Sequence, residues 1–345
     1  MPALDMIPYD QLAIHDTGAP VGDGAYTTLV IIHGYVWHSG VFTRILPYAA
    51  KYRTRIVLVN RRDYPGAAPL DGAELEQLQV AKTAATGSPE AVEILRGYFK
   101  ERAKEIHGLL ERFIISERLS KNSVVVVGWS LGVTFLNALL AYAPSFPTGE
   151  INIAGYIKQV VAYDAPQTCM GQPPPPTVYH PFQDSTIPVE ELIERFNVWV
   201  SGYFRHPNPE ALDLQSRDYE AHPTPTVLTM TEDEIASAAY TPAAAEGGSD
   251  EMMVSGIKHG IFNELRLAAL LPSETTCWAR IKWRHVWADQ SIWEIPWSRF
   301  LLEEELEKAA VEGKYTRPVE WVRFERANHF GHWDMPDNFL RAVLG

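Results

Sequence analysis

A serine stands between two glycines at a point where strand, turn and helix patterns meet. Gly128-Trp-Ser-Leu-Gly132 follows the apolar run 123–127 and leads into the apolar stretch 131–142. This is the context in which G-x-S-x-G presents a nucleophile, because the turn is strained and glycines remove side chains that would clash. The Ser130 hydroxyl would lie at a helix N-terminus, where free N–H groups favour developing negative charge. The motif predicts that Ser130 attacks a carbonyl carbon.

Short apolar runs rich in β-branched residues alternate with longer helical patterns along most of the chain. Strands are predicted at 28–32, 55–59, 123–127, 160–163, 281–287 and 320–324. Runs this apolar are typical of strands covered on both faces, as in parallel sheets. Helices are predicted at 89–115 and 131–142. The alternation predicts an α/β fold, a mostly parallel twisted sheet flanked by helices.

One long segment, residues 167–271, interrupts this alternation because it contains no convincing core strand. Four prolines at 173–176 favour a stiff, extended exit from the sheet, and a helix is predicted at 188–204. We therefore predict a core formed by residues 1–166 and 272–345, with 167–271 inserted as a mainly helical cap.

Composition and charge disfavour several kinds of partner. The chain has 345 residues and a net charge of −13 at pH 7, with no run of basic residues beyond Arg61-Arg62, so nucleic acid is a poor partner. No stretch approaches the roughly 18 apolar residues that a membrane span needs. The first 20 residues do not resemble a signal peptide, so we expect a cytoplasmic protein. No pattern predicts the oligomeric state.

Three features together resemble the α/β-hydrolase superfamily. They are the elbow at 128–132, the His33-Gly-Tyr35 turn after the first core strand, and Ala327-Asn-His-Phe330 after the last one. The resemblance covers the chain from about residue 13 onward and implies a serine hydrolase. It implies that the backbone N–H groups of Tyr35 and Leu131 form an oxyanion hole. His33 is expected to brace its loop without transferring a proton.

A serine hydroxyl is a weak nucleophile near neutral pH and needs a base to accept its proton. By the resemblance, His329 has that role, with His332 as the competing candidate. Asn328 replaces the usual glycine, and asparagine tolerates left-handed backbone. His329, His332 and Asp334 could also be interpreted as metal ligands, but the elbow has no use for a metal and no matching cluster occurs elsewhere. The sequence therefore predicts neither a metal nor another cofactor.

The third member of such a site is a carboxylate that orients the histidine and stabilises its protonated form. The superfamily usually places it after the strand that follows the cap, where Ser291 stands at the aligned position. Asp289 lies two residues earlier and Glu294 three residues later. Some lipases carry the acid one strand earlier, and there Asp164 follows the run 160–163. Asp164 is preferred, Asp289 is the first alternative, and Glu294 is the second.

Aromatic residues lie close to each part of this predicted site. Trp37 is in the predicted oxyanion loop, Trp129 adjoins the nucleophile, and Trp199 is in the predicted cap. They predict an apolar pocket for a hydrophobic small molecule. Arg61, in the loop after the strand at 55–59, either binds a substrate carboxylate or is a solvated or salt-bridged loop residue.

Three functions are compatible with these residues. The first is hydrolysis of a hydrophobic carboxylic ester or lactone through an acyl-serine. The second is other chemistry at the same residues, namely C–C bond hydrolysis, acyl transfer or a cofactor-free lyase reaction, because a fold does not fix its reaction. The third is a non-catalytic small-molecule receptor. Dehalogenase or epoxide hydrolase chemistry is disfavoured, because those enzymes attack through an aspartate where this elbow carries Ser130.

Overall fold

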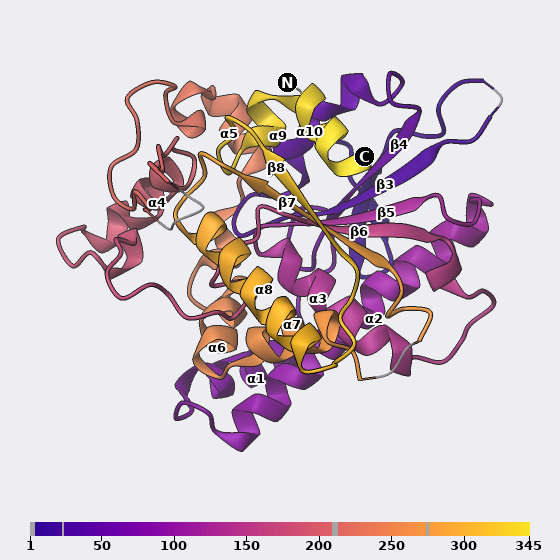
Figure 1. The fold of residues 1–345 in the computed structure, drawn as a ribbon, viewed down its shortest axis with the longest axis horizontal. Helices are drawn as coiled ribbons and strands as arrows, with labels where there is room; N and C mark the ends of the chain where they lie inside the picture. The colour runs from indigo at the N-terminus through magenta and orange to yellow at the C-terminus, as the bar shows by residue number, and fades with distance from the viewer. Residues whose placement is uncertain (1–3, 23, 209–212, 274–275) are drawn as a thin grey trace.

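The computed structural model describes residues 4–22, 24–208, 213–273 and 276–345 (Figure 1). An eight-stranded sheet crosses the described part of the molecule in the order β1-β2-β4-β3-β5-β6-β7-β8. Its strands are β1 (Ile7–Tyr9), β2 (Leu12–Asp16), β3 (Thr27–Ile32), β4 (Thr54–Asn60), β5 (Val124–Trp129), β6 (Ile157–Tyr163), β7 (Lys282–Ala288) and β8 (Val319–Phe324). In this order, each strand from β4 onward is parallel to the next one. The predicted fold class is confirmed.

The central strands form where β-branched residues are buried on both faces. All six residues of β5 are buried, and Val126 pairs with Val30 on one side and Val160 on the other. The antiparallel hairpin of β1 and β2 extends one edge and was not predicted. β1 has only three residues, two of them exposed, so it carries no hydrophobic pattern.

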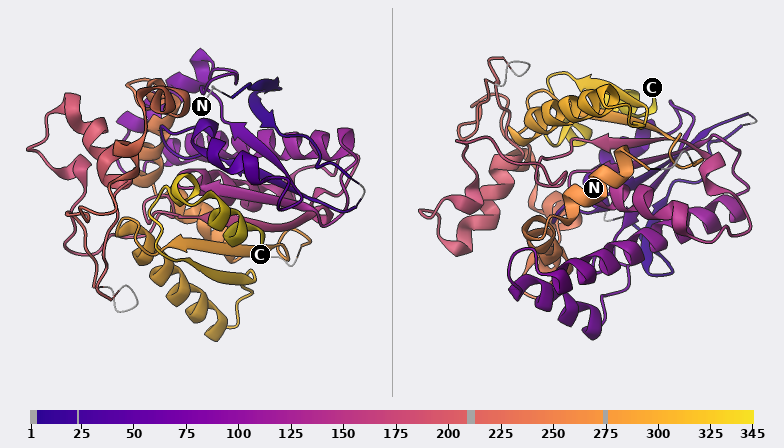
Figure 2. Two further views of the ribbon diagram at one scale, coloured as in Figure 1. Left: turned by 90° about the horizontal axis from the view of Figure 1, so that it is seen from above. Right: turned by 60° about the horizontal axis from the view of Figure 1, so that its bottom comes forward.

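Helices cover both faces of the sheet (Figures 1 and 2). On one face α2 (Pro89–Ser116) and α7 (Ile261–Leu270) pack against α3 (Gly132–Tyr142), with α1 (Gly72–Thr83) beside α2. The opposite face carries the 3₁₀ segment η1 (Ser39–Tyr48), α9 (Gly331–Asp334) and α10 (Pro336–Leu344). The long α8 (Glu294–Val311) follows β7 and packs against it.

The chain between β6 and β7 has helices and no strand among its described elements, joined by long irregular stretches. It contains α4 (Leu192–Val200), α5 (Glu232–Ala238), α6 (Met252–Lys258), α7 and several short 3₁₀ turns. The part around α4 projects from one side of the sheet in Figures 1 and 2. The limits of the predicted cap stay a prediction. Its residues 209–212 lie outside the described residues, as do residues 1–3, 23 and 274–275 of the predicted core.

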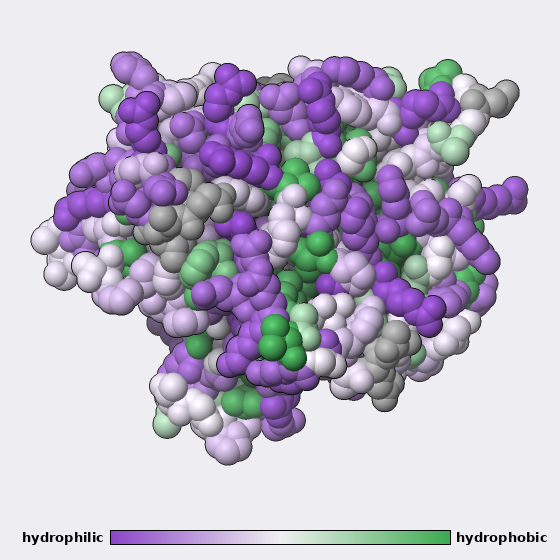
Figure 3. Space-filling view, in the orientation of Figure 1, coloured by the Kyte–Doolittle hydropathy of each residue, from purple (hydrophilic) through white to green (hydrophobic). Residues whose placement is uncertain are grey.

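No helix in the described ranges is long and apolar enough to cross a membrane. The face shown in Figure 3 is mostly hydrophilic, with small hydrophobic patches separated from one another.

Candidate active site

The candidate residues meet at one edge of the sheet because each follows the carboxyl end of a parallel strand. Ser130 follows β5, Asp164 follows β6, and His329 comes five residues after β8 ends. The His33 turn follows β3, which lies next to β5. Open α/β sheets place their ligands at this edge.

The turn that carries Ser130 is strained and tightly packed. Ser130 has a φ of 53°, in the left-handed region, and its N–H donates to the Tyr163 carbonyl at 3.1 Å. A Cβ on Gly128 would lie 2.6 Å from the Gly132 carbonyl oxygen, and a Cβ on Gly132 would overlap the Ile32 carbonyl oxygen. A side chain at either glycine would collide with neighbouring backbone, so this tight turn requires both glycines.

Asp164 contacts the imidazole of His329 directly. Its Oδ2 lies 2.6 Å from His329 Nδ1, and neither residue is more than 2% exposed. Its Oδ1 accepts the Ala288 N–H at 2.7 Å, and its Oδ2 also accepts the Ser291 hydroxyl at 2.7 Å. A carboxylate fixed in this way orients the ring and leaves Nε2 as the nitrogen available for proton transfer.

The two other carboxylates lie elsewhere. Asp289 accepts hydrogen bonds from Arg323 Nε at 3.0 Å and from the Arg326 N–H at 2.6 Å. Glu294 is buried and accepts the Thr168 hydroxyl at 2.7 Å. Burial alone would raise the pKa of Glu294, but hydrogen bonding to His180 and Thr168 holds that pKa below its usual value. The structure therefore brings Asp164, and neither alternative, into contact with His329.

His332 occupies a different environment from His329. Its ring stacks on Phe42 with centroids 4.3 Å apart, and its backbone N–H donates to the Tyr163 hydroxyl at 3.2 Å. Burial, with a contribution from His329, lowers the pKa of His332 well below its usual value. No carboxylate among the described residues bonds to its ring, so it lacks the orienting partner that His329 has.

Asn328 has a different role from the one expected. The left-handed φ of this turn, 59°, falls on Arg326, so tolerance of that conformation does not explain the asparagine. Its side-chain amide instead donates to the Ser201 carbonyl at 2.6 Å and to the Thr226 hydroxyl at 2.7 Å. Both partners belong to the β6–β7 connection, so Asn328 joins that segment to the histidine turn.

The two residues expected to supply the oxyanion-hole amides both lie next to Ser130 or to one of its neighbours. A Cβ on Gly34, which precedes Tyr35, would stand 3.0 Å from Ser130 Cβ. Leu131 follows the serine and immediately precedes α3. Within the described residues, neither the Tyr35 nor the Leu131 N–H donates to a protein acceptor. Among the described residues, Ser130 Oγ and His329 share no hydrogen bond either. In ligand-free active sites the distance between nucleophile and base is often too long for one.

The three tryptophans expected around the substrate are all buried, with 1–3% of each exposed. Trp129 lies beside His329, with ring centroids 5.2 Å apart, and its indole N–H donates to the His329 carbonyl. Trp37 donates to Asn197 Oδ1 of α4 at 3.1 Å, and Trp199 donates to the Ser216 carbonyl. Each indole N–H is thus satisfied inside the protein, and a role in a substrate pocket stays a prediction.

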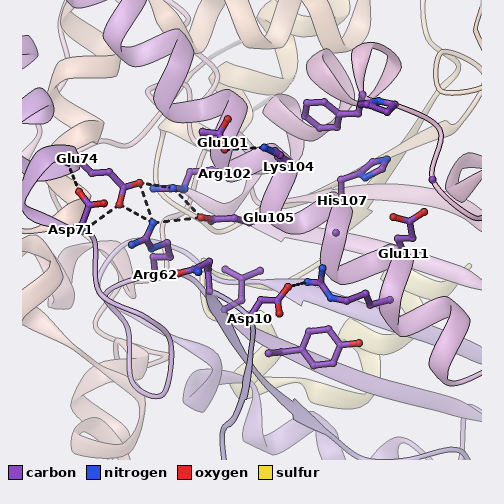
Figure 4. Close-up of a pocket in the computed structure, with 18 residues that line it drawn as sticks. Asp10, Arg62, Asp71, Glu74, Glu101, Arg102, Lys104, Glu105, His107 and Glu111 are labelled. Carbon is purple, nitrogen blue, oxygen red and sulfur yellow. Dashed lines mark hydrogen bonds and ion pairs between the residues drawn. The ribbon is translucent and has the colours of Figure 1, made fainter.

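A cavity of about 640 Å³ lies away from these residues, between the β1–β2 hairpin and α2. Figure 4 shows Arg62 and Arg102 pointing toward Glu74 and Glu105 within it, and these four side chains form ion pairs. These four charges are therefore paired with one another. In the described ranges no group of three or more His, Cys, Asp or Glu is placed to hold a metal ion.

Two contributors to the site were missed by sequence reasoning. Ser291 was noted only as the residue standing where a carboxylate was expected, and its hydroxyl binds the carboxylate of Asp164 instead. Asp250 pairs with Arg61 across 189 residues of chain, and no local pattern indicated it. Arg61 is thus engaged in an internal salt bridge.

The comparisons with known proteins agree with this fold. The model of the alpha/beta hydrolase family matches residues 29–342, and the chain belongs to that family. Comparison of the sequence with curated proteins gave no significant match.

Solved structures show the same fold at low sequence identity. An epoxide hydrolase from Vigna radiata is 11% identical, covering 98% of this chain and 96% of its own, with a TM-score of 0.52. A putative aryl esterase from Burkholderia cenocepacia is 14% identical, covering 97% and 94%, with a TM-score of 0.51. A peroxisomal alpha-beta-hydrolase from Saccharomyces cerevisiae is 10% identical, covering 96% and 79%, with a TM-score of 0.50.

Proposed function

We propose that the protein is a serine hydrolase that cleaves a hydrophobic carboxylic ester or lactone through an acyl-serine intermediate. The observation that carries this proposal is the 2.6 Å contact between Asp164 Oδ2 and His329 Nδ1, on the same sheet edge as the strained Ser130 turn. A serine, a histidine and a fixed carboxylate in these relations are the parts that acyl transfer needs.

In the proposed reaction, Ser130 Oγ attacks the carbonyl carbon while His329 Nε2 takes its proton. The N–H groups of Tyr35 and Leu131 stabilise the negative charge on the carbonyl oxygen. The protonated His329, stabilised by Asp164, then gives its proton to the departing alkoxide, leaving the acyl-serine. Water attacks that ester with His329 again as base, which releases the carboxylic acid and restores Ser130.

The surroundings of the site support a hydrophobic substrate. Trp129 borders His329, and Tyr35 meets Phe196 of α4 edge to face, with centroids 6.2 Å apart. Arg61 is paired with Asp250, which leaves it unsuited to binding a substrate carboxylate. We also propose that residues 167–271 act as a cap, since α4 contacts the loop that carries Tyr35 and Trp37.

The test is reaction with a fluorophosphonate probe, with the labelled residue located by mass spectrometry. A panel of p-nitrophenyl esters is assayed alongside, with Ser130→Ala, His329→Gln and His332→Gln as variants. Labelling and turnover that require both Ser130 and His329 would support the proposal. We expect His332→Gln to retain turnover, provided that the variant folds.

Two other outcomes would redirect the interpretation. Labelling of Ser130 without ester turnover would favour C–C hydrolysis, acyl transfer, a lyase reaction or a receptor. An absence of labelling, repeated with a smaller sulfonyl fluoride that a closed cap would admit, would contradict the nucleophilic role of Ser130.

A further inference from the structure

The peptide between Gly34 and Tyr35 is held from its carbonyl side by two donors. Gly34 O lies 2.9 Å from Arg61 Nη2 and 2.9 Å from His33 Nδ1. A trans peptide is planar, and its C=O and N–H point in opposite directions. Fixing the Gly34 carbonyl therefore also fixes the direction of the Tyr35 N–H.

The protonation of His33 follows from its two contacts. The backbone N–H of Arg61 donates to His33 Nε2 at 3.2 Å, so Nε2 is the acceptor and Nδ1 carries the proton. Burial, together with the charge of Arg61, lowers the pKa of His33 well below its usual value. The neutral ring thus donates to Gly34 O, and no proton is free for transfer.

Arg61 is itself held by a carboxylate from the β6–β7 connection. Its Nη1 lies 3.0 Å from Asp250 Oδ1, and the Tyr64 hydroxyl donates to Asp250 Oδ2 at 2.5 Å. The same hydroxyl accepts the Val36 N–H at 3.0 Å. Arg61 is 5% exposed, and Tyr64 and Asp250 are 1% exposed each. One buried network thus binds the carbonyl of residue 34 and the amide of residue 36, the two neighbours of Tyr35.

We propose that Arg61, held by Asp250 and Tyr64, is a positioning residue that directs the Tyr35 N–H toward the developing oxyanion. Because Asp250 lies between β6 and β7, that connection supports the oxyanion hole through Arg61. This inference rests on the proposed function of Ser130.

Two physical effects favour the role. A charged donor on a carbonyl oxygen polarises the peptide, which strengthens the opposite N–H as a donor. A buried ion pair adds little net stability compared with apolar residues of similar volume, which agrees with its use for positioning.

The connection reaches the same loop at a second place. The His38 N–H donates to Ala238 O, and the Tyr240 N–H donates to Val36 O, both at 2.8 Å. These bonds form an antiparallel bridge between Trp37 and Ala239. The Tyr35 loop is therefore attached to the β6–β7 connection through both backbone and side chains.

The experiment compares variants that remove the network with a matched arginine control. Asp250→Asn and Tyr64→Phe keep the side-chain shape, and the double variant Arg61→Met with Asp250→Leu replaces the pair by apolar groups so that no buried charge is orphaned. The control is Arg62→Gln. The Arg62 side chain points toward Glu74 and Glu105 in the cavity of Figure 4. Thermal unfolding identifies any variant that fails to fold.

The readouts separate positioning from folding. We expect kcat on a p-nitrophenyl ester to fall by about 10- to 100-fold in the double variant, with KM changed by less than about threefold. The inhibition constant of a trifluoromethyl ketone, whose adduct carries an oxyanion, should rise by a similar factor. The phosphonylation rate of Ser130 should also fall, and Arg62→Gln should match the unmodified protein.

The outcomes are distinguishable. If the unmodified protein reacts at Ser130 and the folded double variant equals Arg62→Gln in kcat and inhibitor affinity, the positioning role is wrong and the serine hydrolase proposal stands. A rise in KM alone would also contradict it, because an oxyanion contact acts on the transition state. If the unmodified protein does not react at Ser130, the proposed function fails and the positioning role fails with it.

Discussion

The Ser291 hydroxyl donates to Asp164 Oδ2 at 2.7 Å, although the two residues follow different strands of the sheet. Ser291 follows β7, where the superfamily usually places its carboxylate, whereas Asp164 follows β6. The two strands are parallel neighbours, with Tyr163 paired to Val286. Their carboxyl ends are therefore close enough for either to supply a group to the same histidine.

Replacing Ser291 by alanine should weaken catalysis without abolishing it. The Asp164 carboxylate would lose one of its donors while keeping the Ala288 N–H and His329. We expect kcat to fall by about tenfold, roughly the value of one hydrogen bond to a charged group. Steady-state kinetics would measure the loss, and Ser291→Thr, which keeps the hydroxyl, should recover most of it. Equal loss in both variants would indicate a packing defect instead.

Asp164→Asn should be far more damaging than Asp289→Asn. We expect a loss in kcat of about 10³- to 10⁴-fold at Asp164, because an amide cannot stabilise the imidazolium. Asp289 binds Arg323 and the Arg326 N–H, so its replacement should change kcat by less than about threefold. Adding Ser291→Asp to Asp164→Asn should restore part of the rate. A lower rate for Asp289→Asn than for Asp164→Asn would overturn this assignment.

Gly132→Ala should destabilise the protein, because its Cβ would overlap the Ile32 carbonyl oxygen. Overpacking of this kind costs about 1–3 kcal/mol. The matched control is Gly97→Ala in α2, where a Cβ meets nothing within 4 Å and should stabilise the helix by about 0.5–1 kcal/mol. Urea unfolding of both variants measures the two effects, and a shift of the same sign at both sites would contradict the packing argument.

Stability should fall between pH 7 and pH 5 because of buried neutral histidines. Burial, with a contribution from Arg299, lowers the pKa of His285 to about 3. Between pH 7 and pH 5 His285 stays neutral in the folded protein but takes up a proton in the unfolded chain, where its pKa is about 6.5. Acidification over this range therefore lowers the free energy of unfolding by about 2 kcal/mol. His285→Phe should remove that share of the pH dependence. Urea unfolding at pH 7 and at pH 5 measures the free energy of unfolding of both proteins. If the variant loses as much of it as the unmodified protein does, His285 does not contribute.

The sequence predicted the core strands and the Ser130 turn well because their signals are local. β5 is a valine run buried on both faces, and the glycine spacing of the turn reflects contacts within a few residues. The β1–β2 hairpin was missed because β1 is short and mostly exposed. In the structure Asp164 contacts His329, whereas the sequence left three candidate carboxylates. Which carboxylate reaches the histidine depends on how the ends of β6, β7 and β8 lie together. Asp250 could not be predicted, because its contact with Arg61 spans 189 residues.

The long separation between the partners of the site has a consequence for folding kinetics. Asp164 and His329 are 165 residues apart, and they meet only after β7 and β8 have joined the sheet beside β6. Contacts of such high sequence separation form slowly because loop-closure entropy is lost first. During refolding, helical circular dichroism should therefore recover before enzymatic activity does. The lag between the two signals would time the closure of this last part of the sheet.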